Sequence, residues 1–90
     1  MRLRLFATLR NLAGAKELEM EAPPTVGALL EELSRRWGKA FDDQLFDDEG
    51  HLLPGVIVLV NGRHIAHLDG RETPLCDGDA VDLFPPLAGG

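Results

Sequence analysis

Apolar and charged residues alternate over the first six positions of the chain. Arg2 and Arg4 alternate with Leu3 and Leu5. A period of two is typical of a strand that buries one face. Residues 1–6 are therefore predicted to form an opening strand.

A short helical pattern and a second alternation follow this strand. Leu9, Leu12 and Ala13 fall at helical spacing and stop at Gly14, which predicts one short turn of helix. Residues 16–21 alternate two apolar residues with three glutamates, which predicts an antiparallel second strand with a charged outer face. Two consecutive prolines then end this strand, because proline has no backbone N–H to donate.

The clearest periodic signal is an apolar stripe with helical spacing. Its members are Val26, Leu29, Leu30, Leu33 and Trp37. Thr25 before the stripe is a favourable N-cap residue, and Gly38 after it is typical of a helix end. These features predict a helix over residues 25–37. Residues 39–54, which are rich in Asp and Glu, are predicted to be a solvated acidic loop without the spacing of a calcium site.

Three further strands are predicted in the second half of the chain. Residues 56–60 form a continuous apolar run, as expected of a strand that is covered on both faces. Asn61-Gly62 follows at once and is a strong hairpin signal, so a return strand is predicted from 63–65. After a turn at 77–79, the last strand is predicted at 80–84.

The predicted order is strand, strand, helix, strand, strand, strand. Sequential hairpins around a single helix indicate an α+β fold, in which one mixed sheet carries the main helix on one face. This is the ubiquitin-like β-grasp arrangement, with the first and last strands side by side at the centre. Residues 1–90 are predicted to be a single domain of this kind, with a flexible C-terminal Gly-Gly tail at 86–90.

Composition and charge exclude several classes of function. The 90 residues contain nine Lys and Arg against fifteen Asp and Glu, a net charge of −6, and 6% aromatic residues. This acidic balance lacks the basic footprint of a nucleic-acid-binding protein. Cys76 is the only cysteine, which excludes an internal disulfide and a cysteine-ligated cluster. No apolar run approaches the roughly 20 residues of a membrane span, so a cytoplasmic protein without a membrane partner is expected.

No internal group of residues has the pattern of an active site. His64 and His67 are three positions apart, and on the predicted return strand their side chains would face opposite sides. No third ligand is evident, so we expect exposed loop histidines and no metal site. Ser34 lies on the predicted helix without the partners of a catalytic triad. The chain is therefore predicted not to be an enzyme on its own.

The end of the sequence is the exception. It reads Phe84-Pro85-Pro86-Leu87-Ala88-Gly89-Gly90. The prolines stiffen the exit from the last strand, and four extended residues beyond them reach about 13 Å. Such a tail can enter a narrow channel and present an unhindered acyl carbon. A carboxylate is inert as an acyl donor until it attacks the α-phosphate of ATP; a sulfur nucleophile can then convert the acyl-adenylate to a thioester or thiocarboxylate.

Three blocks of the sequence resemble one known family. Residues 5–14, with Leu-Phe-Ala-Thr-Leu-Arg and Ala-Gly, residues 77–81, with Asp-Gly-Asp-Ala-Val, and residues 84–90 are similar to the small subunit of molybdopterin synthase (MoaD), a family of ubiquitin-like sulfur carriers. The resemblance covers nearly the whole chain, and its most specific block is the tail.

The resemblance implies a function and its partners. A ubiquitin-activating-type adenylyltransferase (MoeB) would use ATP to adenylate Gly90, and a sulfur donor would convert it to a thiocarboxylate. The loaded tail would insert into the synthase large subunit (MoaE), which delivers sulfur to a pterin precursor of the molybdenum cofactor. Gly89 would permit passage of the tail, and the carrier itself would bind no cofactor. The implied partner-binding residues are Phe6, Phe84, Pro85, Pro86, Leu87 and Ala88.

Two departures from the family leave the partner open. The stretch 47–55 lengthens the loop before the third strand relative to the shortest members, and His64 occupies a position that is apolar in some members. One alternative is a sulfur carrier for thiamin or tRNA thiolation, and another is a ubiquitin-like modifier joined through Gly90 to a lysine. The third is an interaction domain that is never activated.

Overall fold

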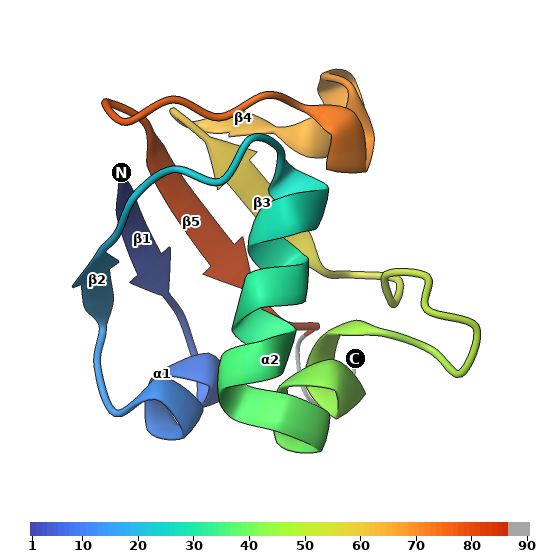
Figure 1. Ribbon diagram of the computed structural model, residues 1–90. Helices are drawn as coiled ribbons and strands as arrows, with labels where there is room; N and C mark the ends of the chain where they lie inside the picture. The colour runs from blue at the N-terminus through green and yellow to red at the C-terminus, as the bar shows by residue number, and fades with distance from the viewer. Residues whose placement is uncertain (87–90) are drawn as a thin grey trace.

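Five strands form one mixed sheet, and a long helix crosses one of its faces (Figure 1). The structure is a computed structural model that describes residues 1–86. The elements in chain order are β1 (Arg2–Leu5), α1 (Thr8–Ala13), β2 (Glu17–Glu19), α2 (Val26–Leu45), β3 (Ile57–Val60), β4 (Arg63–His64) and β5 (Ala80–Phe84). Two 3₁₀ turns, η1 (Ile65–His67) and η2 (Gly70–Glu72), lie between β4 and β5.

The two ends of the chain meet at the centre of the sheet. The strand order is β2-β1-β5-β3-β4, and β1 pairs in parallel with β5 while the other pairs are antiparallel. Leu3 lies opposite Val81 and Leu5 opposite Leu83. The predicted α+β arrangement, with the first and last strands as neighbours, is confirmed.

The core lies between α2 and one face of the sheet. Its central side chains are at most 1% exposed, and they are Leu3, Leu5, Leu29, Leu30, Leu33, Val58, Val81 and Leu83. Each buried side chain of this size contributes about 1.5–3 kcal/mol relative to an exposed one. Because successive side chains of a strand point to opposite faces, every second residue of β1 and β5 points toward α2.

Helix α2 begins where the sequence predicts but does not end there. The hydroxyl of Thr25 accepts a hydrogen bond of 3.1 Å from the backbone N–H of Ala28, so the predicted N-cap is confirmed. At Gly38 the backbone leaves helical geometry, with φ 66° and ψ −148°, and the chain then forms a second helical segment up to Leu45. The apolar stripe ends at this kink.

The predicted loop over residues 39–54 is wrong in its first part, because 39–45 are helical. Phe41 and Leu45, one helical turn apart, are both fully buried, and their burial stabilises this segment. Lys39 and Asp43 form an ion pair of 3.1 Å across the same turn on the exposed side. The acidic residues that suggested a loop occupy the solvent side of a short amphipathic helix.

Strand β3 also differs from its prediction, because one of its faces is uncovered. Val58 and Val60 point into the core, whereas Ile57 is 38% exposed and Leu59 is half-buried. The continuous apolar run therefore does not indicate cover on both faces. We call the side of the sheet away from α2 the open face; within residues 1–86, no helix lies across it (Figure 1).

The segment after the hairpin brings two histidines together. The hairpin at Asn61-Gly62 is confirmed, with φ of 52° and 83°. The return strand stops at His64, and the 3₁₀ turn that follows places the His64 and His67 rings 6.3 Å apart. The expectation that they face opposite sides is wrong, because η1 is not a strand. Among the described residues, no three potential metal ligands gather at one place, and no helix has the length and apolar character to span a membrane.

We predict that Gly38→Ala lowers the free energy of unfolding by about 1–3 kcal/mol, because alanine is strained at positive φ with ψ near −150°. No atom lies within 4 Å of the position that the new Cβ would take, so backbone strain alone causes the loss. Gly78→Ala is the control, since its surroundings are equally open and its φ is not positive. Denaturant unfolding checks both variants, and equal stabilities would contradict the account.

Candidate functional site

Two phenylalanines predicted to contact partners stack on each other where β5 ends. The rings of Phe6 and Phe84 lie 4.1 Å apart between centroids, at an interplanar angle of 13°. Phe6 is placed there because the chain continues the parallel pairing beyond β1, and its N–H donates a 3.2 Å hydrogen bond to the Leu83 carbonyl. The Arg10 guanidinium lies 5.3 Å from the Phe6 ring centroid, within cation–π range.

The turn between β1 and α1 holds Phe6 in this position. Ala7 has φ 54° and ψ −132°, a conformation that side-chain-bearing residues seldom adopt. The Leu9 N–H closes the turn with a 3.2 Å hydrogen bond to the Phe6 carbonyl. Such backbone strain costs about 1–3 kcal/mol and persists only where the surroundings enforce it.

An apolar groove of about 400 Å³ adjoins the stacked pair at the point where the tail leaves the sheet. We call it the tail-outlet groove; its lining residues are Ala7, Pro54, Gly55, Ile57, Phe84, Pro85 and Pro86. None of these residues has a titratable side chain. The groove can therefore hold apolar side chains of a partner but supplies no acid, base or nucleophile.

An ion pair occupies the centre of the open face. Arg4 of β1 lies opposite Asp82 of β5 and donates two hydrogen bonds to its carboxylate, of 2.6 and 2.8 Å. Asp82 is only 7% exposed, so this pairing compensates the cost of burying its charge. The hydrogen bond to Asp82 and the charge of its carboxylate raise the pKa of Arg4 above its ordinary value.

The structure brings together four of the eight residues predicted for the site. Phe6 and Phe84 form the stack, and Pro85 and Pro86 line the groove. Leu87, Ala88, Gly89 and Gly90 lie outside the described residues.

Sequence reasoning missed several other residues of this surface. Ile57 could not be distinguished from its apolar neighbours in the run 56–60. Pro54 and Gly55 were assigned to a loop and given no role. Arg4 and Asp82 carried one usable signal: Asp82 is a charged residue between two apolar ones in a central strand.

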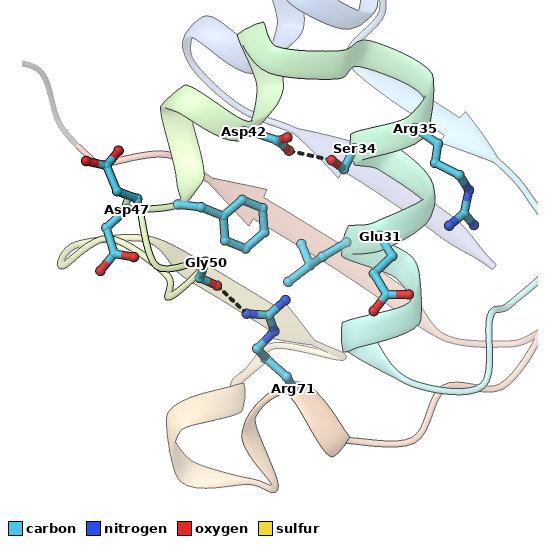
Figure 2. Close-up of a pocket in the computed structure, with 10 residues that line it drawn as sticks. Glu31, Ser34, Arg35, Asp42, Asp47, Gly50 and Arg71 are labelled. Atoms are coloured by element: carbon cyan, nitrogen blue, oxygen red, sulfur yellow. Dashed lines mark hydrogen bonds between the residues drawn. The ribbon is translucent and has the colours of Figure 1, made fainter.

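A second pocket, of about 460 Å³, is lined by residues of α2, of the loop that follows it and by Arg71 (Figure 2). The Arg71 guanidinium crosses it, donating a 2.8 Å hydrogen bond to the Gly50 carbonyl and lying 5.2 Å from the Phe46 ring centroid. The Ser34 hydroxyl donates a 2.5 Å hydrogen bond to Asp42. No histidine is among the residues that line this pocket, so Ser34 lacks the Ser–His pair of a catalytic triad there.

The fold and the open face define the class of this protein. A mixed sheet in this order, one helix across one face and a central last strand are the features of a ubiquitin-like β-grasp domain. A family model described as the ThiS family matches residues 3–90. The chain belongs to this family of ubiquitin-like sulfur carriers, which includes MoaD, and the resemblance drawn from the sequence is thereby confirmed.

Several relatives match the chain over its whole length. It is 44% identical over 92 residues to small archaeal modifier protein 3 of Haloferax volcanii, covering 100% of this chain and 98% of the relative. It is 37% identical over 95 residues to the molybdopterin synthase sulfur carrier subunit of Escherichia coli, covering 100% and 99%. The solution structure of small archaeal modifier protein 1 from Methanosarcina acetivorans matches with a TM-score of 0.80 at 32% identity, covering 99% of this chain and 94% of that one.

These relatives establish the class of the protein. They leave open which molecule receives the group that the carrier transfers. Members of the family are small, non-catalytic carriers that work with partner enzymes. Both a molybdopterin synthase subunit and archaeal modifier proteins are among the relatives.

We predict that Arg4→Leu lowers the melting temperature by several degrees, because it leaves the Asp82 carboxylate buried without its partner. The double variant Arg4→Leu with Asp82→Leu should regain most of the loss, since two apolar side chains then replace the pair. Thermal unfolding of the three proteins checks this. A single variant as stable as the wild type would show that the ion pair contributes nothing.

Proposed function

We propose that this chain is a sulfur carrier for molybdenum cofactor biosynthesis, loaded at Gly90 and docked on its partners through the open face. The observation that carries the proposal is the apolar end of this face. Phe6, Phe84 and Ile57 gather there, beside the point where β5 passes into the tail. Exposed apolar patches of this kind mark sites of protein contact.

The chemistry proposed for the tail takes place in two steps. The Gly90 carboxylate attacks the α-phosphate of ATP on an activating enzyme, and pyrophosphate leaves as an acyl-adenylate forms. A hydrosulfide equivalent then attacks the acyl carbon, and AMP leaves with the bonding electrons, which gives the thiocarboxylate. ATP is a substrate of the activating enzyme, and the carrier needs no cofactor of its own. Gly89 places no Cβ beside the reacting carbon.

The partners proposed are a MoeB-like adenylyltransferase and a MoaE-like large subunit of molybdopterin synthase. Both would cover Phe84 and Phe6 and accept Pro85, Pro86 and the tail residues Leu87 and Ala88. The net charge of −6 favours basic partner surfaces, chiefly by raising the rate of encounter. Sulfur would pass from Gly90 to the pterin precursor inside the synthase complex.

A second candidate is a ubiquitin-like modifier, which is supported by the 44% identity to small archaeal modifier protein 3. The adenylation step is the same, but the Nζ of a lysine on another protein then attacks the acyl carbon. AMP leaves, the nitrogen loses a proton, and an amide forms. A carrier for thiamin or tRNA thiolation would differ only in the final sulfur acceptor. The three functions are distinguished by the molecule that receives the sulfur or the acyl group from the loaded chain.

We predict that the wild-type chain, incubated with ATP, magnesium, a MoeB-like enzyme and sulfide, exchanges one oxygen for one sulfur at Gly90. Intact mass spectrometry with fragmentation of the tail detects the exchange. A chain that lacks Gly90, or that carries one extra residue after it, should gain no sulfur while keeping the same melting temperature. Loading of these altered chains, or no loading of the wild type, would contradict the proposal.

We predict that Phe84→Ala raises the Kd for the MoaE-like subunit about tenfold or more, as expected of an aromatic anchor in an interface. The variant should lose less free energy of unfolding than free energy of binding, because Phe84 is only half-buried in the free chain. Leu83→Val is the opposite control: it should cost about 1 kcal/mol of stability and leave the Kd unchanged. Calorimetric titration checks both, and matching losses of stability and affinity in Phe84→Ala would favour a purely structural role.

A further inference from the structure

The loop before β3 touches the tail where it leaves the sheet. At Gly55, φ is 92°, and a Cβ built on this residue would lie 3.5 Å from the Pro86 Cβ and 3.6 Å from its Cα. The backbone of the loop therefore packs beside Pro86 with no side chain between them. We call Pro54 and Gly55 the loop wall; together they form one side of the tail-outlet groove.

The loop wall is held in place from α2. The Leu53 N–H donates a 2.8 Å hydrogen bond to the Leu45 carbonyl at the end of the helix, and the Val56 N–H donates one of 3.2 Å to Leu53. Residues 46 and 52 form a β-bridge that closes the loop between them. The wall is thus fixed on both sides of its two residues.

Inside that closed loop, a carboxylate adds further order. Asp47 accepts hydrogen bonds of 2.9 Å from the backbone N–H groups of Glu49 and His51. The bond from His51 is the main cause that holds the pKa of Asp47 below its ordinary value of 3.8. Arg71 of η2 donates a hydrogen bond to the Gly50 carbonyl of the same loop (Figure 2). The loop is therefore a structured part of the domain that has a defined position relative to β5.

Packing is the main constraint on the two prolines that lead from β5 into the tail, since no hydrogen bond of their backbone is found among the described residues. Neither Pro85 nor Pro86 has an N–H to pair with a neighbouring strand, so packing must orient them. Pro85 is buried and Pro86 half-buried. The wall packs against Pro86, and Ala7, with its strained backbone, also lines the groove.

We propose that the loop wall positions the tail for loading, and that Gly55 is the residue through which it acts. The wall limits the directions in which Pro85 and Pro86 leave β5. This lowers the conformational entropy that the tail must lose on entering the channel of an activating enzyme. The inference rests on the proposed function, since loading of Gly90 is the reaction that this positioning serves.

Two glycines of the same loop provide a matched test. Gly55→Ala and Gly50→Ala both place alanine at positive φ, 92° and 82° respectively, so their backbone strain is similar. Relief of that strain at Gly55 shifts the backbone that touches Pro86. At Gly50 no atom, Pro86 included, lies within 4 Å of the new Cβ, so relief of the strain there moves the carbonyl that Arg71 binds and not the contact with Pro86.

The readout is the rate of adenylation by a MoeB-like enzyme as a function of carrier concentration. Gly55→Ala is expected to raise the KM about fivefold with little change in kcat, which corresponds to about 1 kcal/mol of lost binding. Gly50→Ala should keep the wild-type KM at a similar melting temperature. Pro54→Ala, which trims the wall without a positive-φ penalty, should raise the KM in the same direction as Gly55→Ala.

The outcomes separate this inference from the function on which it rests. If the wild type is loaded but Gly55→Ala and Pro54→Ala keep its KM, or if Gly50→Ala raises the KM equally, the positioning role is overturned and the carrier function remains. If the wild type is not adenylated at all, both the proposed function and the positioning role are overturned.

Discussion

The parallel pairing of β1 with β5 is the contact on which the rest of the structure depends. It joins the two ends of the chain at the centre of the sheet, and Leu5 and Leu83 from these strands complete the buried face under α2. The same pairing places Phe6 next to Phe84, because the chain continues in register beyond β1. One arrangement thus stabilises the core and directs the tail out from the middle of the sheet.

The two faces of the sheet serve different purposes. The face under α2 is closed by packed aliphatic side chains, whereas the open face keeps Ile57 exposed beside the stacked phenylalanines. The Arg4–Asp82 pair keeps the middle of this face polar. Among the described residues, Ile57 is the large apolar side chain that is exposed, and it lies opposite Phe84 at the end of β5. The pocket beside α2 differs from the apolar groove in having a polar lining, in which Arg71 and Ser34 already have hydrogen-bond partners.

The sequence predicted most of the elements because their signals are local. The cap at Thr25, the hairpin at Asn61-Gly62 and the alternation in the first strand each depend on neighbouring residues, and the structure confirms them. The helix over 39–45 was missed because Gly38 interrupts the stripe and acidic residues mask Phe41 and Leu45.

Contacts between distant parts of the chain could not be predicted in this way. The approach of Gly55 to Pro86 joins positions 31 residues apart (86 − 55), and no local pattern encodes it. The exposure of Ile57 depends on which face α2 covers, which an apolar run does not reveal. The central claim is that the tail end of the open face is the docking surface. Methyl NMR with saturation transfer from an unlabelled MoeB-like enzyme to an isotope-labelled chain tests it most directly. We expect the strongest transfer at the methyl groups of Ile57; strong transfer at the exposed methyl group of Ala40 on α2, with Ile57 unaffected, would contradict the claim.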